Sequence, residues 1–181
     1  MKFLKIIALV FLFFTIQSCY EKLNFNQVDE IVYRPIFTSS LTNFTLLPAQ
    51  FFNNQGIQQN SVSDSTTFDL LQDDLLQKEM FKIDFYAEMK NEFDRDLTIN
   101  VQFLDENNSI VYNFSPIQVP SSTTNTTYLE EILINQNPAI LNTVRVLISV
   151  ELEHTGTQMN PNSTDEFELK SSITAYIESE I

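Results

Sequence analysis

Apolar and polar side chains alternate with a period of two through the second half of the chain, and this pattern constrains the fold more than any other feature. It covers residues 81–90, 97–104, 144–153 and 167–178, and it continues over 110–114. Successive side chains of a β-strand point to opposite faces of the sheet, so each segment predicts a strand with one buried face and one wet face. Such strands are typical of antiparallel sheets, because strands of parallel sheets are buried on both faces.

Two antiparallel sheets packed face to face bury both apolar faces at once, so the pattern predicts an all-β antiparallel sandwich. Hydrophobic residues make up 43% of the chain and include 16 Phe, which is enough for a packed core. Short strands are expected over 31–37 and 41–47, and the Asn-, Gln- and Ser-rich segment 50–67 is expected to be a loop. Short helical turns at 73–80 and within 129–141 leave this fold class unchanged.

The links between strands agree with a sandwich. Residues 105–109 predict a hairpin turn, 115–127 a crossing between sheets, and 154–165 a loop before the last strand. Residues 81–105, with Asn91-Glu92-Phe93 between two alternating segments, resemble the B–C hairpin of immunoglobulin-like extracellular modules. The resemblance implies an immunoglobulin-like sandwich, although a chain with no Trp and a single Cys is not an antibody-type domain. That architecture hosts many unrelated functions, so it implies none by itself.

The first nineteen residues are typical of an export signal. Lys2 and Lys5 precede the apolar run 6–16, which is shorter than the roughly 20 residues that a membrane-spanning helix needs. Ile16, Gln17, Ser18 and Cys19 then resemble the lipobox of bacterial lipoproteins. In that family the cysteine sulfur, here that of Cys19, carries a diacylglycerol, the chain is cut before Cys19, and the new amine is acylated. The alternative is an ordinary secretory peptide with an unpaired cysteine near the cut.

The lipobox resemblance implies a division of the chain into a signal peptide (1–18), a lipidated tether (19–30) and a single sandwich domain (31–181). In the Gram-negative sorting rule, an aspartate after the cysteine retains a lipoprotein in the inner membrane, so Tyr20 implies the outer membrane. Glu21 resembles the acidic surface-export tags of some Gram-negative lineages and favours the cell surface over the periplasmic face. Loss of residues 1–18 lowers the formal charge from −14 to −16, because Lys2 and Lys5 are removed. Anionic headgroups repel such a domain, which predicts that the tether holds it off the membrane.

Composition excludes several classes of function. A formal charge of −14 excludes a nucleic-acid binder that neutralises phosphates. Only 2 glycines are present, so no Gly-rich phosphate loop can form, and 1 His with 1 Cys excludes the usual zinc site and any internal disulfide. No Gly-x-Ser-x-Gly elbow occurs, and His154 has no partner that suggests a nucleophile–base pair. The sequence therefore predicts a protein that is not an enzyme.

One turn and one triplet suggest further sites. Glu92, Asp94 and Asp96 lie together between two predicted strands, and their carboxylates suit Ca²⁺, a hard cation that prefers oxygen ligands. The plainer alternative is a solvated turn, and no other cofactor is expected. Asp64-Ser65-Thr66 resembles a three-residue O-glycosylation site of some Gram-negative secretory proteins, with Ser65 as the acceptor.

Apolar and aromatic side chains on faces assigned to solvent indicate a binding surface. In the predicted register this set comprises Tyr86, Leu104, Val111, Leu147 and Tyr176. With the anchor, it predicts a non-catalytic accessory subunit of a larger outer-membrane complex, such as a β-barrel transporter, a secretion channel or a barrel-assembly machine. The alternative is a surface module that binds a glycan or another ligand. A subunit would spread these side chains over a flat apolar face, whereas a glycan binder would cluster them beside a concave polar cleft.

Overall fold

A computed structural model describes residues 32–69, 71 and 73–180 of the 181-residue chain. Residues 33–179 form one compact unit, and the other unit comprises 1–32 with 180–181. The predicted signal peptide, the tether and the lipobox residues Ile16, Gln17, Ser18 and Cys19 lie outside the described residues. Within the described part of the chain, no helix is both long enough and apolar enough to cross a membrane.

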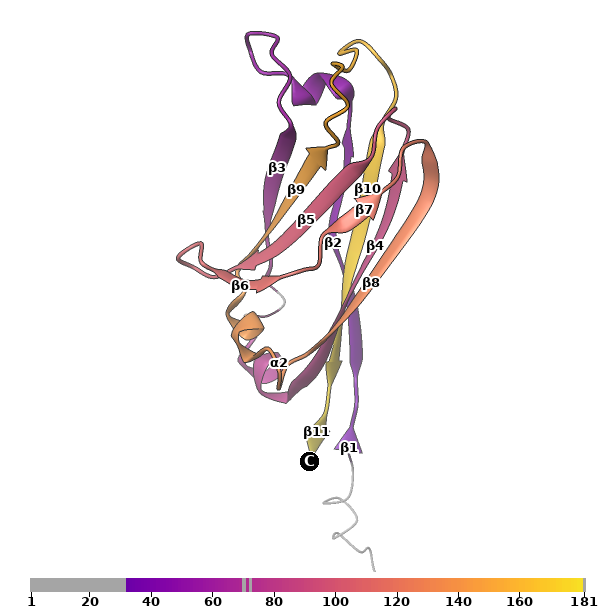
Figure 1. The fold of residues 1–181 in the computed structure, drawn as a ribbon. Coiled ribbons are helices and arrows are strands. Elements are labelled where there is room, and N and C mark those ends of the chain that lie inside the picture. Colours follow the sequence, from indigo (N-terminus) through magenta and orange to yellow (C-terminus); the bar gives the residue numbers. More distant parts are fainter. Residues whose placement is uncertain (1–31, 70, 72, 181) are drawn as a thin grey trace, which may run out of the picture. The chain divides into compact units, whose positions relative to one another are not determined.

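Two antiparallel sheets form the larger unit, as Figure 1 shows, and they confirm the predicted all-β sandwich. The four-stranded sheet has the order β2 (Ile36–Leu46), β10 (Phe167–Ile177), β4 (Met80–Asn91), β8 (Thr123–Leu133). The five-stranded sheet has the order β3 (Ser61–Thr67), β9 (Arg145–Leu152), β5 (Leu97–Leu104), β6 (Ile110–Asn113), with β7 (Ile117–Val119) also paired to β5. β1 (Val32–Tyr33) and β11 (Ser179–Glu180) make a separate two-stranded sheet. The helical elements are short, as expected: η2 (Pro48–Phe51), α2 (Asp74–Glu79) and η4 (Pro138–Asn142).

The strands pair in a nested order that corrects the immunoglobulin-like expectation. β2 pairs with β10, β3 with β9, β4 with β8, and β5 with β6 and β7, so the first strand of the sandwich pairs with its last. This is the arrangement of a jelly roll, whereas the immunoglobulin order places the first two strands side by side. β4 and β5 belong to different sheets, so residues 81–105 cross between sheets and do not form a paired hairpin. The predicted hairpin at 105–109 is confirmed, because Asp105 N donates to Ser109 O at 3.0 Å between β5 and β6.

The core lies between the sheets and is supplied mainly by the alternating segments. Aromatic and β-branched side chains suit a half-buried pleated surface, which is why these segments form strands. Their buried inward residues include Ile83, Phe85, Ala87, Met89, Leu97, Ile99, Val101, Phe103, Val146, Ile148, Val150, Leu169, Ile173 and Ala175.

Two bulges shift side chains away from the faces that strict alternation predicts. The register moves between Tyr176–Lys82 and Ile177–Met80, so Phe81 is an extra residue and lies exposed instead of in the core. The register also moves between the pairs Phe103–Tyr112 and Leu104–Ile110, so Val111 on β6 is an extra residue, and it packs partly buried against the core instead of facing outward. Leu104 keeps the regular alternation of β5 opposite Arg145 on β9, yet it is only 7% exposed, so its prediction as an exposed side chain is wrong. A bulge adds one residue to one strand, so alternation beyond it changes phase.

Three segments differ from their predicted structure. Segment 50–67, expected to be a loop, contains β3, which pairs with β9 along its whole length. Segments 115–127 and 129–141 contain the strands β7 and β8, which were not predicted. The link from β7 to β8 does cross between the sheets, and η4 supplies the helical turn expected within 129–141. The edge strands β3 and β8 have few buried apolar residues, so period-two alternation does not mark them. The segment 154–165 is a loop, as predicted.

Candidate protein-binding surface

The outer face of the four-stranded sheet carries a row of apolar and aromatic side chains across all its strands. Tyr176 on β10 pairs with Ile36 on β2 and with Lys82 on β4, and Lys82 pairs with Leu133 on β8. Paired residues share a face, so these four side chains stand side by side on the outer surface. Ile36 and Leu133 are exposed, and Phe81 brings its ring centroid within 6.2 Å of that of Tyr176.

A second row lies four residues further along β4, about 13 Å away at the rise of a β-strand. Here Tyr86 pairs with Ser172 on β10 and with Leu129 on β8, and Leu129 is 57% exposed. We call the apolar and aromatic residues of both rows the outer patch, which comprises Ile36, Phe81, Tyr86, Leu129, Leu133 and Tyr176.

A polar network holds the ring of Tyr176 in place. Asp84 lies between the rows, and its Oδ2 accepts hydrogen bonds from Tyr176 OH at 2.7 Å and from Lys82 Nζ at 3.2 Å. Asp84 Oδ1 is buried and makes no hydrogen bond, but it lies 3.1 Å from the Lys82 ammonium in an ion pair. The same ammonium stands 4.0 Å above the centroid of the Tyr176 ring, a cation–π contact. Lys82 therefore neutralises the carboxylate and fixes the ring at the same time.

The titration of these groups follows from their partners. The hydrogen bond to Asp84, followed by burial, raises the pKa of Tyr176, and the hydrogen bond to Glu88, followed by burial, raises the pKa of Tyr86. Burial alone would lower the pKa of Lys82, but the hydrogen bond to Asp84 and the charges around it outweigh burial and raise it. Both phenols of the outer patch therefore stay neutral, with an apolar ring available for contact.

The structure separates the residues that the sequence grouped as partner-binding. Tyr86 and Tyr176 share the outer face of the four-stranded sheet, as predicted. Val111 on β6 packs partly buried against the core, and Leu147 lies on the other sheet, paired with Ser65 and Gln102.

Sequence reasoning missed four members of the outer patch. Phe81 is turned outward by a bulge, Leu129 and Leu133 belong to a strand where a helical turn was expected, and Ile36 lies on an edge strand without clear alternation. Exposed apolar residues in β8 would have been found only by reading its threonine run as a strand, since β-branched residues favour strands.

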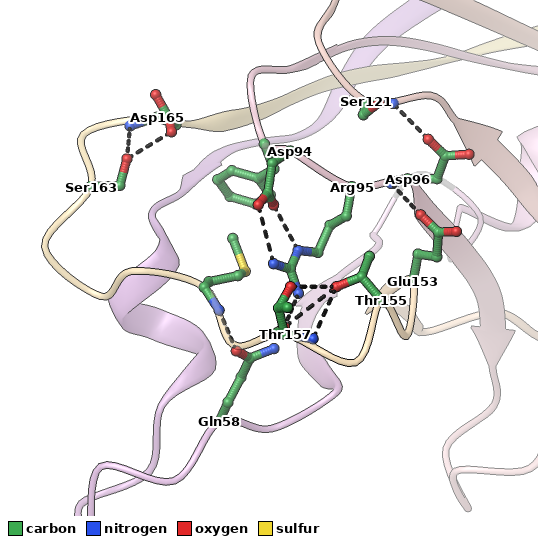
Figure 2. Close-up of polar contacts among 12 residues, drawn as sticks. Gln58, Asp94, Arg95, Asp96, Ser121, Glu153, Thr155, Thr157, Ser163 and Asp165 are labelled. Carbon is green, nitrogen blue, oxygen red and sulfur yellow. Dashed lines mark hydrogen bonds and ion pairs between the residues drawn. The ribbon is translucent and has the colours of Figure 1, made fainter.

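Figure 2 shows the end of the sandwich where Asp94 and Asp96 lie. The structure does not gather their carboxylates with that of Glu92. Asp94 pairs with Arg95, at 2.9 Å from Oδ1 to Nε. Asp96 Oδ1 accepts the Ser121 N–H at 2.8 Å, and Glu92 pairs with Lys90 Nζ at 2.7 Å. Each carboxylate thus faces a different donor. No group of three or more potential metal ligands occurs in the part of the chain that is described.

The turn of the suggested calcium site instead ties loops together around Arg95, which is 2% exposed and was not singled out from the sequence. Its Nη1 donates to the Thr157 carbonyl at 3.1 Å, so it fastens the β9–β10 loop to the turn after β4 (Figure 2). The Met159 N–H donates to Gln58 Oε1 at 2.7 Å and fastens the same loop to the segment before β3. A buried guanidinium needs such partners, which makes Arg95 a structural tie. His154 lies exposed in this loop.

Ser65 lies exposed on the edge strand β3, where its N–H donates to Asp64 Oδ1 at 2.8 Å. Its glycosylation stays a prediction.

Depressions on the described surface include two that bear on ligand binding. One, of about 510 Å³, is lined mainly by polar residues of the β5–β6 turn, Asp105, Glu106 and Asn107, and by Asn142 and Thr143. None of the residues that line it is aromatic. The other, of about 420 Å³, lies between β2 and the segment that follows β3, and its one aromatic residue is Phe68, which is buried. Neither depression is lined by a residue of the outer patch.

Comparisons with known proteins give no family. No protein-family model and no curated protein matches the chain. Among solved structures, the chain is similar to a "putative secreted protein" from Parabacteroides distasonis, with 17% identity and a TM-score of 0.48 over 63% of this chain and 37% of that one. It is also similar to a chain of the T13 IBDV viral particle, with 7% identity and a TM-score of 0.47 over 80% and 31%. A third similar structure is an isomalto-dextranase from Arthrobacter globiformis complexed with panose, with 11% identity and a TM-score of 0.33 over 63% and 16%.

This chain spans less than two fifths of each of these three chains. No TM-score among them reaches 0.5, so these likenesses carry no argument about function. The function of this chain is therefore inferred from its own residues.

Proposed function

We propose that this protein is an outer-membrane lipoprotein, anchored through lipid on Cys19 and facing the cell surface. It acts as a non-catalytic accessory subunit of a larger outer-membrane complex, built on a β-barrel transporter, a secretion channel or a barrel-assembly machine. The single observation that carries the proposal of a subunit is the outer patch. The lipobox resemblance of residues 16–19 supplies the anchor and the location.

The form of the outer patch favours a protein partner over a glycan. Its side chains are spread over the face of a sheet, from Ile36 on one edge strand to Leu133 on the other. Glycan sites place aromatic rings beside a polar cleft, and the larger polar depression has no aromatic residue in its lining. Large apolar side chains exposed together on a folded protein mark surfaces that other proteins cover.

The outer patch has the composition of an interface centre. Protein interfaces bury roughly 800 Å² on each partner, with an aromatic and apolar centre and a polar rim. Tyrosine is enriched among the residues that contribute most to binding. Thr127 and Lys170 lie on the row beyond Tyr86 and form part of such a rim, while Thr38 lies at the β2 edge of the row between the two rows of the outer patch.

The test is a mild-detergent pull-down of the tagged, lipidated chain from its own envelope, with stoichiometric partners identified by mass spectrometry. Leu129→Lys places a charge in the outer patch, and Ile57→Lys does the same at a residue of matching exposure, 56% against 57%, away from it. We expect one envelope protein to co-purify with the wild type and with Ile57→Lys, and its yield to fall at least tenfold with Leu129→Lys. A chain that stays alone in mild detergent would contradict the proposal, and a glycan-binding screen would be the next experiment.

A further inference from the structure

β2 is an edge strand with unusual composition. Among the described residues it is paired on one side only, by β10, and its 11 residues, Ile36–Leu46, include no charged side chain and no proline. The other edge strands of comparable length carry acids, Glu130 and Glu131 on β8 and Asp64 on β3. Natural sheets protect their open edges with charges, prolines or bulges, because unpaired backbone groups recruit other strands. On β2 the only such device is the register shift at Leu41.

The inner side of β2 is also left open. Phe37 pairs with Ala175, which is fully buried, so Phe37 belongs to the inner face of the sheet, yet it is 46% exposed. Ser39, two residues further on, is exposed as well. The five-stranded sheet therefore does not cover this half of β2.

The smaller depression lies at this uncovered place. Leu41, Phe68 and Leu76 supply apolar side chains to its lining, and Phe68 and Leu76 reach it from the segment after β3 and from α2. Asp69 and Asp73 add two carboxylates to the same lining. We call β2 and this depression the open seam. The open seam brings three features close together: the unpaired backbone edge of β2, a depression that can hold an apolar side chain, and the negative charge of nearby carboxylates.

We propose that the open seam receives an extended segment of the partner protein, which adds to β2 as a further strand of the four-stranded sheet. This inference rests on the proposed role as a subunit and names how the partner engages. In strand addition, backbone hydrogen bonds supply affinity and pockets for alternate side chains supply specificity. One apolar side chain of the segment occupies the depression, and a Lys or Arg of the segment lies beside Asp69.

Charge decides between such a segment and a second copy of this chain. A second copy would present its own β2, which has no cation to meet Asp69. The whole chain carries a formal charge of −14, so two copies repel as they approach. A segment with alternating apolar residues and at least one basic residue would fill the apolar depression of the open seam and match its negative charge.

The experiment places the photo-reactive residue p-benzoylphenylalanine at Ser39 in the open seam, at Leu129 in the outer patch, or at Gln118 on β7 as an exposed control. The full lipidated chain is cross-linked in its own envelope, and the cross-linked peptide is sequenced by mass spectrometry. We expect Ser39 to cross-link at least ten times more than Gln118. The captured peptide should alternate apolar residues and contain Lys or Arg.

The outcomes separate the two proposals. Cross-linking at Leu129 with none at Ser39 overturns the proposal of strand addition at the open seam and supports the proposed subunit role. Cross-linking at Ser39 with none at Leu129 supports the open seam and contradicts the assignment of the outer patch. Cross-linking at neither position contradicts both, and a Ser39 cross-link to a second copy or to residues 19–31 of the same chain overturns the open seam.

A second measurement uses the captured segment as a synthetic peptide and an analogue that is N-methylated at alternate residues. N-methylation removes backbone donors, so strand addition predicts at least tenfold weaker binding of the analogue to the purified chain. Asp69→Asn should weaken binding of the unmodified peptide roughly threefold, the size expected for an exposed ion pair. Equal affinities of the two peptides would overturn strand addition even if Ser39 cross-links.

Discussion

The two sides of the sandwich, where the edge strands of its sheets face each other, are built in opposite ways. On one side β6 and β8 are joined by Glu130, whose Oε1 accepts from Tyr112 OH at 2.6 Å and whose Oε2 accepts from Tyr128 OH. We call this side the closed seam. On the other side the edge strands are β2 and β3, and the open seam lies here. The β2 hydroxyls bond within their own sheet, as Thr38 does with Thr174 at 2.9 Å.

Aromatic packing deepens the difference. In the closed seam the ring of Phe114 lies 4.7 to 4.9 Å from the ring centroids of Phe85, Phe103 and Tyr112, which come from both sheets. In the open seam Phe37 lacks such a covering layer and stays half exposed. One carboxylate shared by two phenols closes a sandwich edge, whereas serine and threonine side chains leave it available. The closed seam is thus suited to stability and the open seam to binding.

The largest expected effect is on the free energy of unfolding, and it appears when one phenylalanine from each side is replaced by alanine. Phe114→Ala removes a side chain that is 1% exposed and leaves a cavity among three rings, so it should lower the free energy of unfolding by about 3–5 kcal/mol. Phe37→Ala removes a half-exposed side chain and should cost about 1 kcal/mol or less. Urea unfolding followed by circular dichroism measures both. Equal losses would mean that the open seam is packed as tightly as the closed one.

The next effect tests the shared carboxylate. Glu130→Gln keeps the shape of the side chain but removes the negative charge that accepts hydrogen bonds from two phenols and from the Ser115 N–H. It should lower the free energy of unfolding by about 1.5–3 kcal/mol. Glu131→Gln is the matched control, because the neighbouring Glu131 is exposed and only pairs with Lys82 at 3.6 Å, which predicts a loss below about 1 kcal/mol. If both variants unfold at the same urea concentration, Glu130 does not close the seam.

A smaller effect depends on pH. Burial, followed by the hydrogen bond to Glu130, raises the pKa of Tyr112 and of Tyr128 above the ordinary value of about 10. A group with a raised pKa in the folded state holds its proton more tightly there than in the unfolded chain. Its contribution to stability is therefore complete below about pH 10 and is lost as the pH rises through the folded-state pKa.

Urea midpoints of the wild type measured from pH 8 to pH 11.5 should fall at the alkaline end. The double variant Tyr112→Phe/Tyr128→Phe, which has no proton to lose at these positions, should show a shallower fall, and Tyr33→Phe, at an exposed tyrosine, should follow the wild type. A double variant whose midpoints fall as steeply as those of the wild type would show that these phenols do not titrate with unfolding.

The closed and open seams also show what sequence patterns predict in this fold. Strands with one buried face, such as β5 and β9, were predicted because burial imposes alternation on their residues. Edge strands have weaker burial on their inner faces, so β3 and β8 are rich in serine and threonine and lack that signal. Among the seam strands, β6 was predicted from its alternation and β2 was expected as short strands, whereas β3 and β8 escaped sequence reasoning.

Whether a predicted binding residue was placed on the correct face depended on the regularity of its strand pairing. Tyr86 lies in regular register on β4 and was placed correctly on the outer face, whereas Val111 is the extra residue of a bulge on β6 and packs partly against the core. A bulge depends on how two strands pair, and strand order was not available from the period of one segment. The nested pairing of β2 with β10 joins the first and last strands of the sandwich, a contact that local patterns do not report.

The smallest expected effect on stability, and the most direct test of the open edge, is a single charge on β2. Ser40→Lys adds the protection that β2 lacks and should change the free energy of unfolding by no more than about 0.5 kcal/mol, because Ser40 is exposed. It should, however, lower the cross-linking of the partner at Ser39 at least fivefold, since a lysine there hinders strand addition. Asn125→Lys, an exposed residue on the edge strand β8, is the matched control and should leave that cross-link unchanged. If both lysines act alike, the loss reflects net charge, and β2 is no more receptive to a strand than β8.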